Sequence, residues 1–486
     1  MNGSNKLGTT AVGLGLSQSP ALRRARAFLG GQSAVRLTLA STLPGLPFIM
    51  VRALLHQHSG IFNIDFFLIT GLAASGYLTL ASVLFVVVYV LESIRLLDAV
   101  YFFSQQDALF AMHFLADTPR FVGLAWLVAF LALTAGSFQL WRALIPKVSR
   151  RRLIPGLLLL STLLAVAATV DLTQGYNPLL VRAHGRARPH LVGEVLVRMP
   201  LELSRSVSHD QGSTELSHSA TDPLWGASPV RTNRENVVVV VVESMGLLTD
   251  VAARARQLND FQYDSAIQSR YAVTVGSVPF TGATVPGEMR ELCHLQSTVH
   301  VSDATLDGKP PCLPQQFRGL GYETASFHGY RGAMFLREKW YPTLGFESSD
   351  FLTELKDLPT CSGAFYGACD SAIASHIEQR LATKHREGGP PQFLYWMTLT
   401  SHLPVDVSNA PAKPCPITAD TEVCAQLAYI GVVLDSVKKL ALDESTGPTA
   451  IVVVGDHAPP YASMDRRDLF DSNSVPYIVL LPKATK

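Results

Sequence analysis

Three long stretches without a charged side chain lie in the first 172 residues, and they restrict the possible folds more than any other feature. They cover residues 66–91, 121–141 and 153–170, which are 26, 21 and 18 residues long. A helix of about 20 apolar residues crosses a bilayer, so each stretch predicts a membrane-spanning helix. A fourth stretch, residues 37–51, is shorter and contains Pro44 and Pro47, so it fits another span, a re-entrant piece or an interfacial helix. We therefore expect residues 1–172 to form a membrane domain of three to five helices.

Basic residues set the expected orientation of this membrane domain. Lys147 and the three arginines at 150–152 form a short basic loop before the last predicted span, and such loops stay in the cytoplasm. The last span then delivers the rest of the chain to the outer side. A second basic cluster, at residues 23–26, lies inside with three spans and outside with four, so the number of spans stays open. We expect the mixed polar and apolar residues 95–116 to form an amphipathic segment on the outer face.

The six cysteines agree with an exported C-terminal part. All of them lie at or after residue 293, in sequence-local pairs, and an even number of cysteines in an exported domain favours disulfides. A cluster of zinc-binding cysteines is the alternative, but the chain contains no CxxC motif. The expected pairs are Cys293–Cys312, Cys361–Cys369 and Cys415–Cys424.

The C-terminal part alternates strand-like and helix-like stretches. It opens with six consecutive valines at 237–242, a run typical of a central parallel strand that is buried on both faces. Further strands are expected at 324–327, 393–399, 451–454 and 477–481, with helices at 371–384 and 425–442. This alternation predicts a doubly wound, mostly parallel α/β sheet over residues 236–486. Residues 173–235 hold an amphipathic stretch, at 190–201, and then a polar linker.

Acidic and histidine residues follow four of the expected strands. Reactive groups of open parallel sheets gather at the carboxyl ends of the strands, and carboxylates beside imidazoles suit a divalent metal. For any one of these residues, a helix cap or a core histidine is an alternative, but four at one edge favour a metal site. The residues are Glu243, His328, His402 after Ser401, and Asp456 with His457.

A hydroxyl in the loop at 276–293 is the candidate nucleophile. Thr284 lies among small residues, shortly before a helix-like segment at 288–294. A hydroxyl at a helix N-terminus meets free N–H groups and a partial positive charge, and a nearby cation lowers its pKa. Ser277 and Thr281 compete with Thr284, which could also merely cap the helix.

Together these motifs resemble the alkaline-phosphatase/sulfatase superfamily, over roughly residues 236–485. The closer resemblance is to its membrane-anchored transferases: lipoteichoic acid synthases, periplasmic-glucan phosphoglycerol transferases and lipid A phosphoethanolamine transferases. The resemblance implies an alkaline-phosphatase-like fold and one divalent metal, Zn, Mn or Mg, held by Glu243, Thr284, Asp456 and His457. It also implies that Thr284 is the catalytic nucleophile and that His328, Arg337 and His402 bind the phospho-alcohol.

The implied reaction moves phosphoglycerol or phosphoethanolamine from a membrane phospholipid to an outer glycan or lipid, through a phospho-threonine. The resemblance places it at the inner membrane, with the catalytic domain on the periplasmic or extracellular side and an envelope-biosynthesis complex as an expected partner. The formal charge of +1 gives no support for a nucleic-acid partner. A phosphodiesterase- or sulfatase-like hydrolase and an inactive glycan-binding scaffold are the alternatives, although no C/S-x-P-x-R motif of a sulfatase is present.

Two signals for the head group disagree. The spacing from Thr284 through Gly287 to Cys293 resembles the phosphoglycerol transferases, and Glu288 occupies a position where lipoteichoic acid synthases carry an acid. Cys361 and Cys369, followed by Asp370, resemble the phosphoethanolamine transferases. The sequence therefore leaves the head group open.

Overall fold

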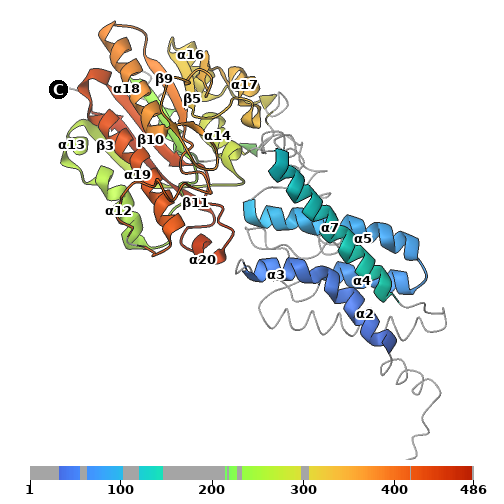
Figure 1. Cartoon of the computed structure of the whole chain (residues 1–486). Helices are drawn as coiled ribbons and strands as arrows, with labels where there is room; N and C mark the ends of the chain where they lie inside the picture. The colour runs from blue at the N-terminus through green and yellow to red at the C-terminus, as the bar shows by residue number, and fades with distance from the viewer. Residues whose placement is uncertain are drawn as a thin grey trace, which may run out of the picture.

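The structure is a computed structural model with a helical N-terminal part and an α/β domain (Figure 1). It describes residues 32–54, 63–101, 120–145, 214–215, 218–226, 233–296, 301, 306–415 and 417–483. The predicted span at 153–170, the basic loop before it and the amphipathic stretch at 190–201 lie outside the described residues.

The N-terminal part contains five helices in the described residues. They are α2 (Gln32–Thr42), α3 (Leu46–Leu54), α4 (Ile64–Ala74), α5 (Leu78–Tyr101) and α7 (Arg120–Leu144), with the 3₁₀ helix η1 (Leu43–Gly45) between α2 and α3. Phe66 of α4, Phe85 and Tyr89 of α5 and Trp141 of α7 meet in one buried aromatic cluster. Among the described residues, two helical stretches are long and apolar enough to cross a membrane, Val35–Leu54 and Leu127–Leu144.

The prediction of one unbroken span over residues 66–91 is wrong. The chain turns between α4 and α5, where Gly76 has φ +97°, a left-handed conformation that glycine adopts without strain. The N–H of Tyr77 reaches back to the carbonyl of Leu72, at 3.2 Å, which ends α4. The stretch at 37–51, with its two prolines, instead lies within one of the two candidate spans. A run of uncharged residues therefore did not identify the helix boundaries.

A seven-stranded sheet forms the centre of the α/β domain. Its order is β3-β11-β10-β2-β9-β5-β6, and β11 is antiparallel to both neighbours while the other strands run in one direction. The strands are β2 (Asn236–Val242), β3 (Tyr271–Pro279), β5 (Glu323–His328), β6 (Ser348–Asp350), β9 (Gln392–Met397), β10 (Thr449–Gly455) and β11 (Ser474–Pro482). The predicted doubly wound, mostly parallel α/β sheet is confirmed.

Helices cover both faces of this sheet (Figure 1). Val239 of β2 belongs to one core, together with Met289 of α14 and Phe317 of α16. Val240 points to the other face, where it joins the core that contains Ile377 and Ile430. Successive residues of a strand point to opposite faces, so the run of valines supplies both cores. The main helices are α12 (Val251–Gln262), α14 (Thr284–Cys293), α16 (Leu313–Gly319), α18 (Asp370–Arg386) and α19 (Thr421–Leu442).

Shorter elements and three disulfides complete the domain. The helices are α13 (Ser265–Arg270), α17 (Arg337–Trp340) and α20 (Met464–Arg467), and two small antiparallel pairs join β1 (Thr214–Glu215) to β4 (Leu295–Gln296) and β7 (Thr360–Cys361) to β8 (Gly367–Ala368). The disulfides are Cys293–Cys312, Cys361–Cys369 and Cys415–Cys424, which is the predicted pairing.

A segment that was expected to belong to the linker packs on this domain. Leu224 is fully buried and belongs to the same core as Met289 and Leu292 of α14. The Thr221 hydroxyl donates to the carbonyl of Glu291, at 2.7 Å, and Trp225 stacks on His294. Residues 218–226 therefore contribute to the α/β fold, although they precede the predicted start of the domain at residue 236.

Candidate active site

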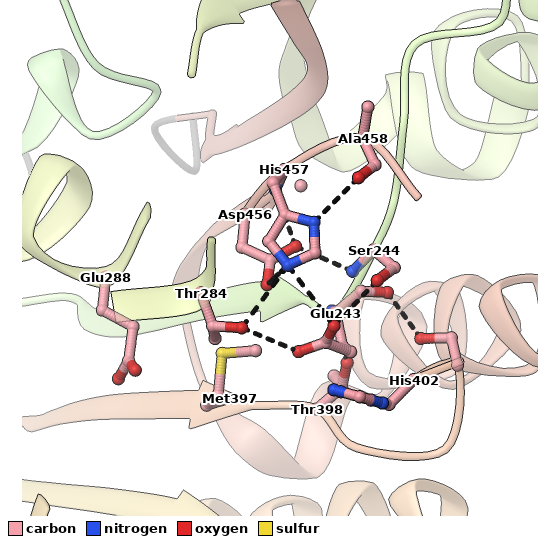
Figure 2. Close-up of polar contacts among 12 residues, drawn as sticks. Glu243, Ser244, Thr284, Glu288, Met397, Thr398, His402, Asp456, His457 and Ala458 are labelled. Atoms are coloured by element: carbon pink, nitrogen blue, oxygen red, sulfur yellow. Dashed lines mark hydrogen bonds and ion pairs between the residues drawn. The ribbon is translucent and has the colours of Figure 1, made fainter. Parts of the chain in front are cut away.

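Four side chains, from two strand ends and the start of α14, converge at the carboxyl edge of the sheet (Figure 2). Glu243 follows β2, while Asp456 and His457 follow β10, which pairs with β2. One ligand atom of each of these three side chains lies within 4.8 Å of the others, and all three residues are buried. The hydroxyl of Thr284 lies 3.2 Å from Glu243 Oε2 and 3.4 Å from His457 Nε2. The sheet therefore brings together the four residues that were predicted to hold the metal.

The hydrogen bonds around Asp456 and His457 leave two ligand atoms available. Asp456 Oδ1 accepts the N–H groups of Ser244 and His457, both at 2.7 Å, whereas the buried Oδ2 has no hydrogen-bond partner. His457 Nδ1 faces the carbonyl of Ala458 at 2.8 Å, so this nitrogen carries the proton and Nε2 keeps its lone pair. Metal-binding histidines typically hold their tautomer through such a carbonyl. The donor set and its orphaned oxygen therefore fit a divalent cation.

The two acids of this cluster have opposite pKa shifts. Burial, together with the charge of Glu243, raises the pKa of Asp456 well above its usual range. Burial also acts to raise the pKa of Glu243, but the electrostatic interactions with the neighbouring imidazoles of His402 and His457 and the hydrogen bond from Ser244 outweigh it and lower the pKa. Two buried carboxylates at this distance are stable either with a retained proton or with a cation between them. Metal binding would therefore displace a proton from Asp456.

Thr284 is not the cap of its helix. Ala283 occupies the N-cap position of α14 and Thr284 is the first helical residue, so its hydroxyl is free to face Glu243 and His457. Ser277 lies within β3 and Thr281 is exposed. Of the three competing hydroxyls, the structure brings Thr284 to the acids.

Helix α14 lies directly against the backbone of the loop that carries Asp456 and His457. Gly287 allows this approach, since a Cβ atom there would lie 2.9 Å from the Cα of Asp456. Arg290, one turn further, donates to the carbonyls of Gly455 at 2.6 Å and Asp456 at 3.2 Å. Its buried charge is balanced by Glu291, 2.5 Å away. Arg290 and Gly287 thus fix the distance between Thr284 and Asp456.

The predicted substrate-binding pair lies in a second buried network. His328 Nδ1 donates to the carbonyl of Met397 at 3.0 Å, and its Nε2 accepts from Arg337 Nη1 at 3.3 Å. Arg337 also donates twice to Glu288 Oε1, at 3.0 and 2.7 Å. The hydroxyls of Tyr341 and Tyr395 donate to the other oxygen of Glu288. The network orients the His328 imidazole and the Arg337 guanidinium together.

Burial and the adjacent Arg337 charge hold the pKa of His328 well below its usual value. His328 therefore remains neutral at physiological pH, with one ring nitrogen donating and the other accepting. Arg337 keeps its charge, because its pKa is raised: the charge of Glu288 outweighs the opposing effect of burial. The pair consists of a guanidinium, balanced by Glu288, beside a neutral imidazole, and a guanidinium is suited to an anionic phosphate.

His402 lies in the loop that follows β9, beside Glu243 (Figure 2). Asp370 holds this loop, since its carboxylate accepts the N–H groups of Leu399 and Thr400. His402 Nδ1 donates to the carbonyl of Leu403 at 2.7 Å, so the ring has a defined orientation. The Ser401 hydroxyl donates to the carbonyl of Glu243 at 2.6 Å, which connects the loop to the cluster of Glu243, Asp456 and His457.

Comparison with known proteins assigns the fold to a family. The family model described as Sulfatase matches residues 235–485, just over half of the chain. The chain belongs to the sulfatase family. The match spans every residue of both networks described above, and the predicted membership of the alkaline-phosphatase/sulfatase superfamily is confirmed.

One curated relative of this sulfatase-family chain is 27% identical over 158 residues, which cover 31% of this chain and 24% of the relative. It is named "Putative cyclic beta-1,2-glucan modification protein" and comes from Rhizobium meliloti (strain 1021). The match therefore spans about a quarter of that protein's length.

Solved structures with a similar fold include transferases. The lipoteichoic acid synthase LtaP of Listeria monocytogenes is 15% identical with a TM-score of 0.42, over 52% of this chain and 67% of that one. The Streptococcus pyogenes phosphoglycerol transferase GacH, in complex with sn-glycerol-1-phosphate, is 15% identical with a TM-score of 0.35, over 59% and 73%. The C-terminal periplasmic domain of EcEptC from Escherichia coli, in complex with Zn, is 12% identical with a TM-score of 0.35, over 51% and 73%.

Several residues of this sulfatase-family site could not be found from sequence motifs. Tyr395 lies inside a buried strand, where an aromatic residue is expected as core, and Tyr341 lies among other aromatic residues. Arg290 follows Thr284 by six residues, and nothing in this spacing indicates that its side chain binds backbone carbonyls. A charged residue on the buried face of a helix was the one available indication.

Proposed function

We propose that this protein is a metal-dependent transferase that moves phosphoglycerol or phosphoethanolamine from a membrane phospholipid to an outer glycan or lipid, through a phospho-threonine on Thr284. One observation carries the proposal. The Thr284 hydroxyl is not used as a helix cap and lies within 3.4 Å of both Glu243 and His457, next to the unpartnered oxygen of Asp456. A hydroxyl in this setting is an activated nucleophile.

A divalent cation held by Glu243, Thr284, Asp456 and His457 would lower the pKa of the hydroxyl and offset the charge of the phosphate. Three oxygen ligands and one nitrogen suit Zn, Mn or Mg. Thr284 Oγ1 donates its hydrogen bond to Glu243, which accepts the proton as the oxygen attacks phosphorus. A bond from Thr284 to phosphorus forms, and the bond from phosphorus to the diacylglycerol oxygen breaks.

His402 and Arg337 take part in both steps, which are formation of the phospho-threonine and its transfer to the acceptor. Both ring nitrogens of His328 are already hydrogen-bonded, whereas the Nε2 of His402 is not used by the bond to Leu403. We therefore assign to His402 the transfer of a proton to the leaving diacylglycerol oxygen, and the uptake of a proton from the acceptor hydroxyl in the second step. The acceptor oxygen then attacks the same phosphorus, the bond to Thr284 breaks, and Glu243 returns its proton to the Thr284 oxygen. Arg337 binds the non-bridging phosphate oxygens.

A glycan acceptor and a membrane location agree with three further observations. The curated relative is named as a glucan modification protein. Two helices are long and apolar enough to anchor the chain, which would hold the site near a lipid donor. Three disulfides are typical of an exported domain. We therefore place the α/β domain on the outer side of the inner membrane, where an envelope-biosynthesis complex is its expected partner.

Head-group transfer can be followed with phosphatidylglycerol and phosphatidylethanolamine that carry a labelled head group. The full-length protein is incubated with each lipid and a divalent metal, with and without candidate glycans. The proposal predicts label on the glycan and release of diacylglycerol. Label that appears only as free phospho-alcohol, even with acceptor present, would instead identify a hydrolase. Thr284→Ala is the matched inactive control.

A further inference from the structure

A disulfide-closed loop forms a wall beside the candidate active site. Cys361 and Cys369 close this loop, and its second strand, β8, lies against the backbone just after His328. The N–H of Ala368 donates to the carbonyl of Gly329 at 2.8 Å. A Cβ atom on Gly367 would lie 2.3 Å from the same carbonyl oxygen. The two backbones are in direct contact, so the loop has a fixed position next to the strand end that carries His328.

The loop places Phe365 between two aromatic rings of the site. Its ring centroid lies 4.8 Å from that of Tyr330 and 4.7 Å from the imidazole of His402. All three side chains are partly exposed, so each shows part of its ring to solvent. We call Tyr330, Phe365 and the His402 ring the aromatic wall. Ser401, the residue before His402, donates to the carbonyl of Glu243 at 2.6 Å, and the Glu243 carboxylate lies 3.2 Å from the Thr284 hydroxyl. This wall therefore borders the cluster that contains Thr284.

Polar groups surround the aromatic wall. Ser362 of the same loop donates to Asp406, which joins the loop to the segment after His402. Arg331 is exposed, and its guanidinium lies 6.0 Å from the centre of the Tyr330 ring. A partly exposed aromatic surface with hydrogen-bonding groups at its edge is typical of a site for a ring that is apolar on its face and polar at its rim.

We propose that the aromatic wall is the acceptor subsite and binds the C–H face of a neutral sugar ring, whose hydroxyl then attacks the phosphorus on Thr284. The inference rests on the proposed transferase function and adds the chemical class of the acceptor. An ammonium head group is the other ligand that aromatic rings bind well. The Arg331 cation beside Tyr330 disfavours a second cation there, and it can donate hydrogen bonds to sugar hydroxyls.

Competition between two acceptors tests the subsite in the full-length protein in lipid nanodiscs. A neutral gluco-oligosaccharide can stack on the wall, whereas glycerol offers the same kind of hydroxyl without a ring face. In Phe365→Ala and Tyr330→Ala, the ratio of kcat/KM for the sugar to that for glycerol should fall about fivefold to tenfold. In Tyr330→Ala, formation of the Thr284 adduct and transfer to glycerol should stay at the wild-type level. Phe365→Ala also removes the contact with His402, so for this variant only the ratio is compared. Tyr330→Phe should retain the sugar preference.

A control variant and a binding measurement without turnover separate loss of sugar binding from a general effect of removing an aromatic ring. Tyr263→Ala removes an aromatic ring that is 67% exposed on another part of the domain, and it should leave the ratio unchanged. Saturation-transfer NMR needs no turnover: irradiation of the protein's aromatic protons should transfer magnetisation to the sugar C–H protons in the wild type, and much less in Phe365→Ala.

The outcomes distinguish this subsite from the reaction itself. An unchanged sugar-to-glycerol ratio in both alanine variants, or a wild type with no preference for the sugar, would overturn the acceptor subsite while leaving the transferase intact. A loss of adduct formation from phosphatidylethanolamine alone would assign the wall to the ammonium of the donor instead, and would also overturn it. A wild type that turns over lipid without an adduct on Thr284 would overturn the proposed function, and the acceptor subsite with it.

Discussion

Asp456 and His457 are adjacent in sequence, yet different backbone groups prepare each of them for a cation. Two N–H groups occupy one oxygen of Asp456 and leave the other unpartnered. One carbonyl fixes the tautomer of His457 and turns its lone pair towards the acids. The motif Gly-Asp-His predicts the ligand types, but the strand end supplies their orientation.

Arg290 should determine metal affinity without contacting the metal. In the double variant Arg290→Met/Glu291→Gln, the buried ion pair is removed as a unit, so the domain should still fold. The carbonyls of Gly455 and Asp456 would lose their donor. We expect metal affinity to fall about 10- to 100-fold, as for other residues that orient metal ligands. Titration calorimetry with Zn²⁺ or Mn²⁺ measures this, and an unchanged affinity in the folded double variant would contradict the role.

His328 should remain neutral over the physiological pH range. Its pKa is lowered by burial and by Arg337, so the unfolded chain, with a pKa near 6.5, binds more protons. The stability that depends on neutral His328 is fully present above that pH, and it is lost as the pH falls through 6.5 towards the folded pKa. Nitrogen-15 NMR of the imidazole should show no protonation between about pH 6 and 8. A His328→Gln spectrum assigns the signal, and a titration midpoint near 6.5 would refute the buried network.

At the scale of the elements, buried strands were predictable, and the two edge strands, β3 and β6, were not. The valine run and the stretch before Gly455 are apolar throughout, which is typical of strands covered on both faces. β3 lies at the sheet edge, contains Gly276 and ends in Pro279, and most of its side chains are exposed or partly exposed. Its valines and Thr274 favour a strand, but Gly276, Ser277 and Pro279 were assigned to the loop at 276–293, so the strand that leads to Thr284 was missed.

Gly287→Ala should separate α14 from the metal-ligand loop. The added methyl group would lie 2.9 Å from backbone and side-chain atoms of Asp456, and neither element can move without breaking the Arg290 bonds. We expect a loss of about 1–3 kcal/mol in the free energy of unfolding and weaker metal binding. Gly319→Ala is the matched control, because a Cβ atom at Gly319 meets nothing within 4 Å. Equal effects of the two substitutions on metal affinity would show that the close approach is unimportant.

At the scale of the whole molecule, the uncharged stretches predicted a helical N-terminal part but not where each helix begins and ends. The break at Gly76 splits one uncharged run into α4 and α5, because a turn with positive φ needs a glycine and not a charge. Local composition also failed to predict where the α/β domain begins. Residues 218–226 are polar in sequence, but Leu224 enters the core and Thr221 bonds to α14.

Leu224→Ala tests whether this segment belongs to the catalytic domain. Leu224 is 0% exposed in a core that includes α14, so its truncation should cost about 2–5 kcal/mol of the domain's unfolding free energy. Trp225→Phe should cost much less, because the aromatic contact with His294 can persist. Denaturant unfolding of the full-length protein, followed by a probe in the α/β domain, measures both. An effect below about 0.5 kcal/mol for Leu224→Ala would show that the segment belongs to the linker and not to the domain.

The central claim, that Thr284 carries the transferred group, is tested most directly by tandem mass spectrometry. The metal-loaded, full-length protein is incubated with phosphatidylglycerol or phosphatidylethanolamine without an acceptor, quenched and digested. The account predicts a phosphoglycerol or phosphoethanolamine adduct on Thr284 that is discharged when the acceptor is added, and no adduct in Asp456→Asn or His457→Ala. Lipid turnover with no adduct on Thr284, or with the adduct on Ser277 or Thr281, would contradict it.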